Sequence, residues 1–281
     1  MSRLIEAHRA RRLLWIDHDP YSAPLLAGGA PPWLDVAACV AWARQAHGLL
    51  GSDVRTLPLA EVAAAWLARD AALAAGMAER TKRAHLPLKA CLASVPLREH
   101  AAALAIALRA ALPDAVFTLV LPSPRDWAAQ ALVLAGGAPD TVVDEDAADA
   151  AAACIADFLR SFATAGIDAV LLRESRTWDA DEAALWLELY RPVANVARHY
   201  GWDWGLQVPS AIEFGETHGP DFAIAPSACG QGPTGLVVPE TFWQGDALPA
   251  PQPGTFDVAD IPAAARPETV LERLALLRER R

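Results

Sequence analysis

Short apolar runs and segments of helix length alternate along the chain. The apolar runs lie at residues 13–17, 86–94, 115–122, 168–174, 204–209, 221–227 and 235–239. Most of them are apolar at odd and even positions alike, which is the pattern of a strand covered on both faces. The sequence therefore predicts a series of buried strands.

Ala- and Leu-rich segments separate several of these runs. They lie at 99–111, 126–136, 145–165 and 180–200, and Asp179 and Glu182 have the spacing of a capping box before the last of them. Alternating strands and helices are typical of right-handed βαβ units, and seven or eight strands in such a series favour a closed barrel. We therefore predict an α/β fold, a (β/α)8 TIM barrel. No G-x-G-x-x-G follows a predicted strand, which disfavours a dinucleotide-binding fold.

The spacing of the elements is uneven. Residues 33–83 hold two helical patterns, and we expect them to form a helical insertion after the first strand. Residues 244–255 are rich in Pro and Gly, and an amphipathic helix is expected at 266–280. The prediction is a single barrel domain over 1–281, in which 244–281 form a C-terminal loop and helix.

The charge balance narrows the set of partners. A formal net charge of −10 and a pI near 5.1 disfavour binding to nucleic acid. No run approaches the roughly 18 to 20 apolar residues of a membrane span, and the first apolar run is too short for a secretory signal. The four cysteines form no C-x-x-C pair. We therefore expect a cytoplasmic protein whose partner is a small molecule, with a homodimer left open.

The first predicted strand ends in the stretch LLWIDHDPY, residues 13–21. Functional groups of a parallel barrel lie at the C-terminal ends of its strands. Asp17 or Asp19 beside His18 can form an acid/base pair, and Tyr21 is a candidate for substrate binding. Alternation along a strand would place Asp17 and Asp19 on one side and His18 on the other. The alternative is an ordinary Asp-Pro turn with His18 packed against a helix.

Lys89 lies inside the predicted strand at 86–94, where an unpaired ammonium would be expensive to bury. It could bind a substrate carboxylate, or serve as an amine of lowered pKa. Alternatively, it pairs with a neighbouring carboxylate or reaches solvent at the bottom of the barrel.

Further strand ends supply more polar groups. Arg125 could hold an anionic ligand as a planar fork, whereas its neighbours Ser123 and Asp126 suit helix capping. Arg173 and Glu174 could serve a polar substrate or form a structural ion pair. Two later strand ends add Gln207 and Glu240 as candidates for substrate binding.

The sequence predicts no metal site and no cofactor. His218 and Cys229 are eleven residues apart without a third ligand close by. No G-x-S-x-G occurs, so a Ser-His-Asp triad has no support.

Three stretches together resemble the uroporphyrinogen decarboxylase and cobalamin-independent methionine synthase superfamily. They are VLPSPRDWA, FLRSFATAGIDAVLLRES and YRPVANVARHYGWDWGLQVP, within residues 85 to 245. The resemblance implies a TIM barrel with a strand that closes on an acidic residue, here Glu174. The sequence lacks the arginine-rich N-terminal signature of the decarboxylases. It reads Gln207-Val208-Pro209-Ser210 where the methyltransferases carry His-x-Cys.

The leading hypothesis is a metal-independent barrel enzyme, of lyase or decarboxylase type, that acts on a small carboxylated substrate by acid/base chemistry. Asp17, His18 and Asp19 would transfer protons, and Glu174 would be a second acid/base. Lys89, Arg125 and Arg173 would neutralise substrate charge. The alternatives are a methyltransferase of the same superfamily with altered ligands and a catalytically inactive barrel that binds a ligand or partner.

Overall fold

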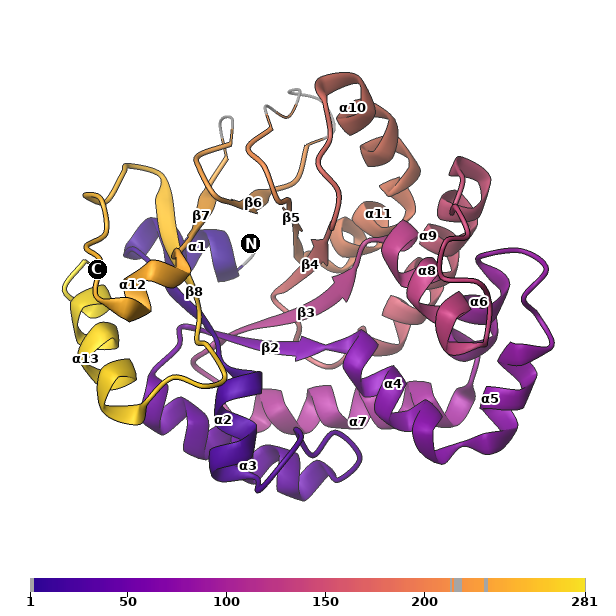
Figure 1. Ribbon diagram of the computed structural model, residues 1–281, viewed down its shortest axis with the longest axis horizontal. Coiled ribbons are helices and arrows are strands. Elements are labelled where there is room, and N and C mark those ends of the chain that lie inside the picture. The colour runs from indigo at the N-terminus through magenta and orange to yellow at the C-terminus, as the bar shows by residue number, and fades with distance from the viewer. Residues whose placement is uncertain (1–2, 213, 215–218, 230–231, 281) are drawn as a thin grey trace.

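Eight parallel strands form a nearly closed barrel (Figure 1), so the predicted TIM-barrel fold is confirmed. The computed structural model describes residues 3–212, 214, 219–229 and 232–280. The strands are β1 (Leu14–Asp17), β2 (Val54–Pro58), β3 (Val116–Pro122), β4 (Ala169–Arg173), β5 (Asp203–Gln207), β6 (Phe222–Ala225), β7 (Thr234–Val237) and β8 (Thr255–Asp260). Their order in the sheet is β1-β8-β7-β6-β5-β4-β3-β2.

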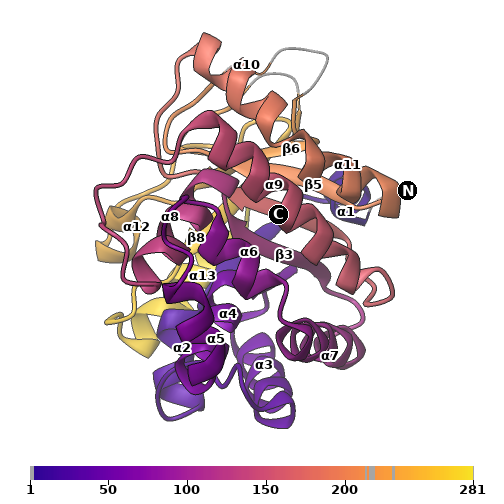
Figure 2. The ribbon, with the colours of Figure 1, turned by 90° about the vertical axis from the view of Figure 1, so that its right-hand side faces the viewer.

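Thirteen α-helices occur within the described residues. They are α1 (Arg3–Ala10), α2 (Asp19–Leu26), α3 (Val36–Leu50), α4 (Leu59–Arg69), α5 (Ala71–Ala78), α6 (Leu86–Leu92), α7 (Val95–Ala111), α8 (Pro124–Leu134), α9 (Glu145–Leu159), α10 (Ala180–Leu189), α11 (Arg191–Tyr200), α12 (Glu240–Gln244) and α13 (Pro267–Arg278). Helices α4, α5, α6, α8 and α9 gather on the right of Figure 1, the side that faces the viewer in Figure 2. Between β5 and β7 the described residues contain no helix.

Side chains alternate between the inside of the barrel and the surrounding helices. Trp15, Phe222 and Phe256 belong to one buried cluster inside the barrel. A Cβ at Gly205 would collide with the Phe222 ring, so Gly205 faces this cluster. Alternation then assigns the last residue of each strand to the inner or the outer face. A polar residue at the end of a strand therefore faces the same side of the barrel wall as the apolar residue two positions before it.

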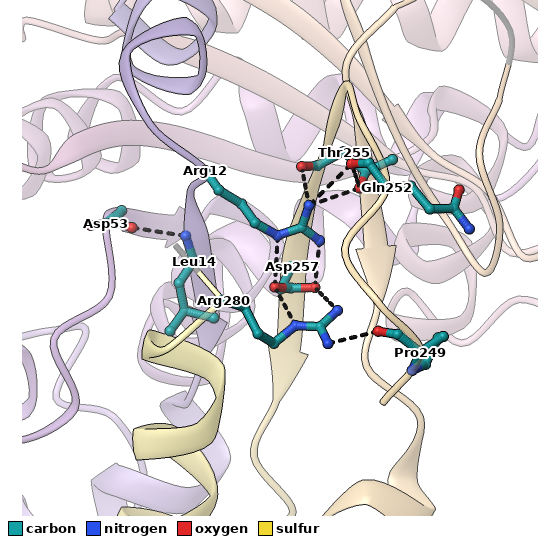
Figure 3. Close-up of polar contacts among 8 residues, drawn as sticks. All are labelled: Arg12, Leu14, Asp53, Pro249, Gln252, Thr255, Asp257 and Arg280. Carbon is teal, nitrogen blue, oxygen red and sulfur yellow. Dashed lines mark hydrogen bonds and ion pairs between the residues drawn. The ribbon is translucent and has the colours of Figure 1, made fainter. Parts of the chain in front are cut away.

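The barrel is closed between β1 and β2 by side-chain oxygens. The Leu14 amide donates to the Asp53 carboxylate at 2.8 Å (Figure 3), and the Ile16 amide donates to the Ser52 hydroxyl at 2.9 Å. One backbone bond joins the two segments, from the Asp53 amide to the Leu14 carbonyl at 2.9 Å. Polar side chains thus satisfy backbone donors that a regular ladder would otherwise pair.

Two predicted boundaries in the first half of the chain are wrong. Segment 33–83 is not an insertion between the first two strands, because it contains β2. The additional helices, α4 to α6, instead follow β2. Residues 86–94 are not a strand, since α6 occupies most of them. Pro87, Leu88, Cys91 and Leu92 are buried there with helical spacing.

The last strand, β8, begins at the end of the predicted loop 244–255 and was not expected as a strand. Its outward residue Asp257 is buried, and both of its oxygens accept from Arg12 at 3.0 and 2.9 Å (Figure 3). Arg280, just after α13, adds a bond of 3.2 Å from Nε. Two guanidiniums therefore neutralise the carboxylate and tie β8 to both terminal segments of the barrel.

Helix caps follow the sequence signals. Asp179 and Glu182 form the expected capping box at the start of α10. Ser123 accepts from the Asp126 amide at the start of α8, so its capping role is confirmed. The expected helix over 180–200 is two helices, because Pro192 lies in the first turn of α11 and cannot donate to the preceding turn.

Within the described residues, no single helix is long and apolar enough to cross a membrane. Helices α6 and α7 meet the test of length and composition only as a pair, and that pair is bent by 63°.

Candidate active site at the barrel mouth

Four charged residues meet where the strands end. We call Asp17, Glu61, Arg173 and Asp260 the mouth cluster. Asp17 and Asp260 are register partners at the ends of β1 and β8. Both follow inward-facing residues by two positions, so both face the inside of the barrel. The Asp17 carboxylate accepts from Nη2 of Arg173, at the end of β4, over 2.5 Å.

Glu61 reaches the mouth from the first turn of α4, directly after β2. Its Oε2 accepts a hydrogen bond from the Trp33 indole at 3.3 Å. Glu61 is exposed, and the charges of Asp17, Arg173 and Arg55 act on it. It therefore belongs to the mouth although no strand carries it.

The mouth shifts the titration of its acids. Burial, followed by repulsion from Asp17, raises the pKa of Asp260 to about 6, and Arg173 opposes this rise. Protein packed around the carboxyl group causes this desolvation, although the residue as a whole is exposed. Desolvation also raises the pKa of Glu61, where Asp17 adds to the rise. Two carboxyl groups thus hold their protons more strongly than free side chains do.

A cavity of about 320 Å3, which we call the mouth pocket, opens beside Arg173. It lies at the C-terminal ends of β2, β3 and β4 and is lined by Glu61, Asp126, Gln130 and Ser175, among others. The Asp126 carboxylate accepts from the Ser175 amide at 2.8 Å and so fixes this part of the rim. The volume is at the lower end of the range that binds small molecules.

His18 and Asp19 do not face the mouth. The chain becomes helical at Asp19, so strand alternation stops and the expectation that Asp17 and Asp19 share one side is wrong. Both His18 and Asp19 are buried, and they contact Trp42 and Arg55, which faces outward because its neighbour Val54 faces the inside of the barrel. We call His18, Asp19, Ser22, Trp42 and Arg55 the wall cluster.

Hydrogen bonds and charge hold the wall cluster together. Nη1 of Arg55, on β2, contacts Oδ1 of Asp19 at 3.2 Å, and the Arg55 guanidinium lies 4.8 Å from the Trp42 ring centroid. Nδ1 of His18 is 2.9 Å from the Ser22 hydroxyl. Burial, then Arg55, lowers the pKa of His18 to about 3, so its ring is neutral. Burial raises the pKa of Asp19, whereas Arg55 lowers it.

Arg125 and Glu174 bind each other. Nη2 of Arg125 donates to Oε1 of Glu174 at 2.6 Å, and the Tyr190 hydroxyl donates to Oε2 at 2.9 Å. The Arg125 guanidinium lies 4.2 Å from the Trp186 ring centroid. The Glu174 side chain is fully buried. The pair is therefore sealed beneath the rim, and Glu174 is bound to Arg125 instead of forming the expected structural pair with Arg173.

Of the other predicted site residues, three lie away from the mouth cluster and one, Gln207, lies beside it. Lys89 is exposed on α6, so its expected place inside a strand is wrong. Tyr21 is buried against α12 in the apolar cluster of Phe242. Glu240 is exposed at the start of α12. Gln207, at the end of β5, is the register partner of Arg173 and lies on the inner face with Gly205.

Sequence reasoning missed Glu61, Asp260 and Arg55. Asp260 ends β8, which the sequence does not predict as a strand, and Glu61 and Arg55 lie in the segment that it predicts as an insertion. The spacing of a strand followed at once by a helix, as in VRTLP before LAEVAAAW, is the signal that could have found β2 and Glu61.

Among the residues that the structure describes, no three His, Cys, Asp or Glu side chains are arranged to hold a metal ion. His218 lies outside the described residues. Cys229 is buried in a loop between β6 and β7, where its amide donates to the Thr234 hydroxyl at 3.2 Å.

Comparison of the sequence with protein-family models and with curated proteins finds no match.

Proposed function

We propose that the protein is an enzyme that transfers protons at the barrel mouth, acting on a small carboxylated substrate in a reaction of lyase or decarboxylase type. The observation that carries this proposal is the convergence of Asp17, Arg173 and Asp260 on the inner face at three strand ends. Active sites of TIM barrels lie at this end of the strands.

Each member of the mouth cluster has a distinct role in the proposal. Asp260 is the acid/base group, because a pKa of about 6 allows it to gain and lose a proton near neutral pH. Arg173 binds the substrate carboxylate, and Asp17 fixes the orientation of its guanidinium through the 2.5 Å bond. Glu61, with its raised pKa, is a second proton donor at the edge of the mouth pocket.

This assignment changes which residues are proposed to act. Arg173 keeps the role expected from the sequence, whereas Asp17, which was expected to transfer protons, orients Arg173 instead. His18, Asp19 and Glu174 are enclosed by protein and bonded to neighbours, so Asp260 and Glu61 replace them. The proposed chemistry uses carboxyl and guanidinium groups alone. The methyltransferase alternative rests on the sequence resemblance only.

Deuterium exchange tests the proposal without a known substrate. The full chain would be incubated in D2O with a mixture of short oxo- and hydroxycarboxylic acids, and the C–H signals followed by NMR. We expect one acid to exchange or lose CO2, and Asp260→Asn to slow this at least about 100-fold. Asp246→Asn, at an exposed aspartate outside the mouth, is the matched control and should leave the rate unchanged. Exchange that is equally fast in Asp260→Asn would contradict the proposal.

A barrel that binds its ligand without catalysis is the second candidate. The observation in its favour is that three of the groups expected to transfer protons, His18, Asp19 and Glu174, are buried. Under this alternative, carboxylic acids raise the melting temperature of the wild type but not of Arg173→Gln, and no acid exchanges its protons.

A further inference from the structure

A second cavity adjoins the mouth pocket. It has a volume of about 200 Å3 and lies between α4, α6 and α8. Ala60, Glu61 and Gln130 line both cavities, so the two are neighbours along this wall. The lining residues of α4 run from its first turn at the barrel rim to Leu67, two turns further on. We call this second cavity the apolar chamber.

The lining becomes less polar with distance from the mouth. Glu61 and Gln130 are the chamber's two residues with charged or amide side chains, and both are among those shared with the mouth pocket. Deeper walls are formed by Met77, Leu88 and Trp127. Burial raises the pKa of the Cys91 thiol to about 12, so this lining residue is neutral as well. The two cavities together offer a polar end and an apolar end.

Small side chains create the space. Ala63 and Ala64 on α4 face the chamber together with Ala131 on α8. Leucine at these positions would fill much of the volume between the helices. Apolar walls stabilise an apolar guest by about 0.8 kcal/mol for each buried methylene, which is about fourfold in affinity.

The polar end carries a cation with unused donors. Within the described part of the chain, the Arg173 guanidinium donates its hydrogen bond to Asp17 through Nη2, and its Nε is buried without a partner. Arg173 also lines the mouth pocket. A carboxylate is the ligand group that complements a guanidinium in both charge and geometry.

We infer that the mouth pocket and the apolar chamber bind one ligand, a carboxylic acid with an unbranched apolar chain. Its carboxylate binds Arg173, and its chain extends past Glu61 and Gln130 into the chamber. The carboxylate group of the ligand is inferred from the proposed function, whereas its apolar chain is inferred from the apolar chamber. The substrate class is thereby narrowed from any small carboxylic acid to one with an apolar tail.

Calorimetric titration of the full-length protein with butyrate, hexanoate and octanoate tests whether the apolar chain of the ligand contributes to binding. Affinity should rise about fourfold for each added methylene until the chamber is full. Octylamine and octanol, which have the same chain with a cationic or a neutral head, should bind at least tenfold more weakly than octanoate. Tighter binding of octylamine would show that the acidic residues select the head group and would overturn the inference.

Two matched variants locate the chain. Ala64 and Ala68 are both exposed on α4, one turn apart, and of these Ala64 lines the chamber. Ala64→Phe should abolish the dependence of affinity on chain length, whereas Ala68→Phe should preserve it. Unchanged melting temperatures would show that both variants are folded. An equal chain-length dependence in both variants would place the chain elsewhere and overturn the inference.

The inference and the proposed function fail in different ways. If short acids exchange protons in D2O but affinity does not rise with chain length, the chamber is not used and the inference alone fails. If affinity rises with chain length but Arg173→Gln binds octanoate as tightly as the wild type, the chamber binds chains without the carboxylate contact. That result overturns the single-ligand inference and leaves the exchange experiment to decide the function.

Discussion

Asp17 and Asp19 are two residues apart in the chain, yet they lie on opposite sides of the barrel wall. Asp17 faces the mouth and pairs with the partly exposed Arg173, whereas Asp19 is buried outside the wall and pairs with the buried Arg55. In each pair, an aspartate at or just after the end of β1 binds an arginine of a different strand. The environment therefore decides which pair is available for chemistry and which supports the fold.

The two pairs should contribute to stability differently. Water screens the mouth pair, and such pairs add little to the free energy of folding. The wall pair has lost its water, so removing one partner leaves a charge without compensation. Nε and Nη2 of Arg55 have no hydrogen-bond partner among the described residues, which makes Asp19 the principal counter-charge.

The same substitution at Arg55 and at Arg173 tests most directly whether the two pairs differ in stability. We expect Arg55→Met to lower the free energy of unfolding by about 3 to 5 kcal/mol at pH 7, because Asp19 stays buried without its partner. Arg173→Met should lower it by about 0 to 1 kcal/mol. Urea unfolding followed by circular dichroism measures both. Equal losses would show that burial does not separate the two pairs.

The decrease in the free energy of unfolding caused by Arg55→Met should also depend on pH. Arg55 lowers the pKa of Asp19 while burial raises it. Without Arg55, this pKa lies still higher above its unfolded value near 3.8. A carboxyl whose pKa is higher in the folded state contributes stability at low pH and loses it as the pH rises. The difference between Arg55→Met and wild type should therefore be smaller at pH 5 than at pH 8.

A control for this pH effect is the double variant Arg55→Met with Asp19→Asn, which has no carboxyl at position 19. Its stability difference from Arg55→Met should grow with pH, because only the single variant must ionise a buried acid. A difference that is constant between pH 5 and pH 8 would contradict the role of Asp19.

A smaller effect is expected at the sealed pair of Arg125 and Glu174. Tyr190→Phe removes the hydroxyl that donates to Glu174, while the bonds from Arg125 and the Arg176 amide remain. We expect a loss of about 1.5 to 3 kcal/mol in the free energy of unfolding. Tyr200→Phe is the control, since the Tyr200 hydroxyl makes no hydrogen bond within the described chain, and its stability should be nearly unchanged. A similar loss in both would show that the bond to Glu174 adds nothing.

The smallest effect is a shift in titration at the mouth. Carboxyl NMR of the wild type should give a pKa of about 6 for Asp260. Asp17→Asn should lower this pKa because it removes a repelling charge, and Arg173→Gln should raise it because it removes an attracting one. Arg55→Met, in the wall cluster, should leave it unchanged. A shift with Arg55→Met as large as that with Arg173→Gln would mean that Arg55 acts on Asp260 as strongly as Arg173 does, which would contradict this prediction.

The sequence predicted the barrel because most strands are apolar on both faces, as β3 and β4 are. It did not predict β2 or β8, because both carry charge at buried positions. Arg55 in β2 is compensated by Asp19, and Asp257 in β8 by Arg12 and Arg280. Asp19 is 36 residues from Arg55 in the sequence, and Arg12 is 245 residues from Asp257. Local pattern holds no information about such compensation.

The error at α6 has a different cause. A buried apolar run of strand length has no periodicity that separates it from a short helix. The strand prediction makes Lys89 a buried charge, whereas it lies on the exposed side of a helix. The sequence identifies Asp17 and Arg173 because each is the last residue of an apolar strand. Their contact across the mouth depends on how the barrel closes, and the local sequence pattern does not predict this.

The way in which the barrel closes sets an order of events during synthesis. β1 has a full ladder with β8 alone, and the ion pair that fastens them joins Arg12 to Asp257, 245 residues later. At about 5 to 20 residues per second, a ribosome needs roughly 12 to 50 s to make that stretch. During this time β3 to β7 can each pair with the strand made just before, but Trp15 and Ile16 have no strand beside them on the β8 side. The first strand of the barrel thus waits for the last one to be made, and its β8 side stays open to chaperones during that time.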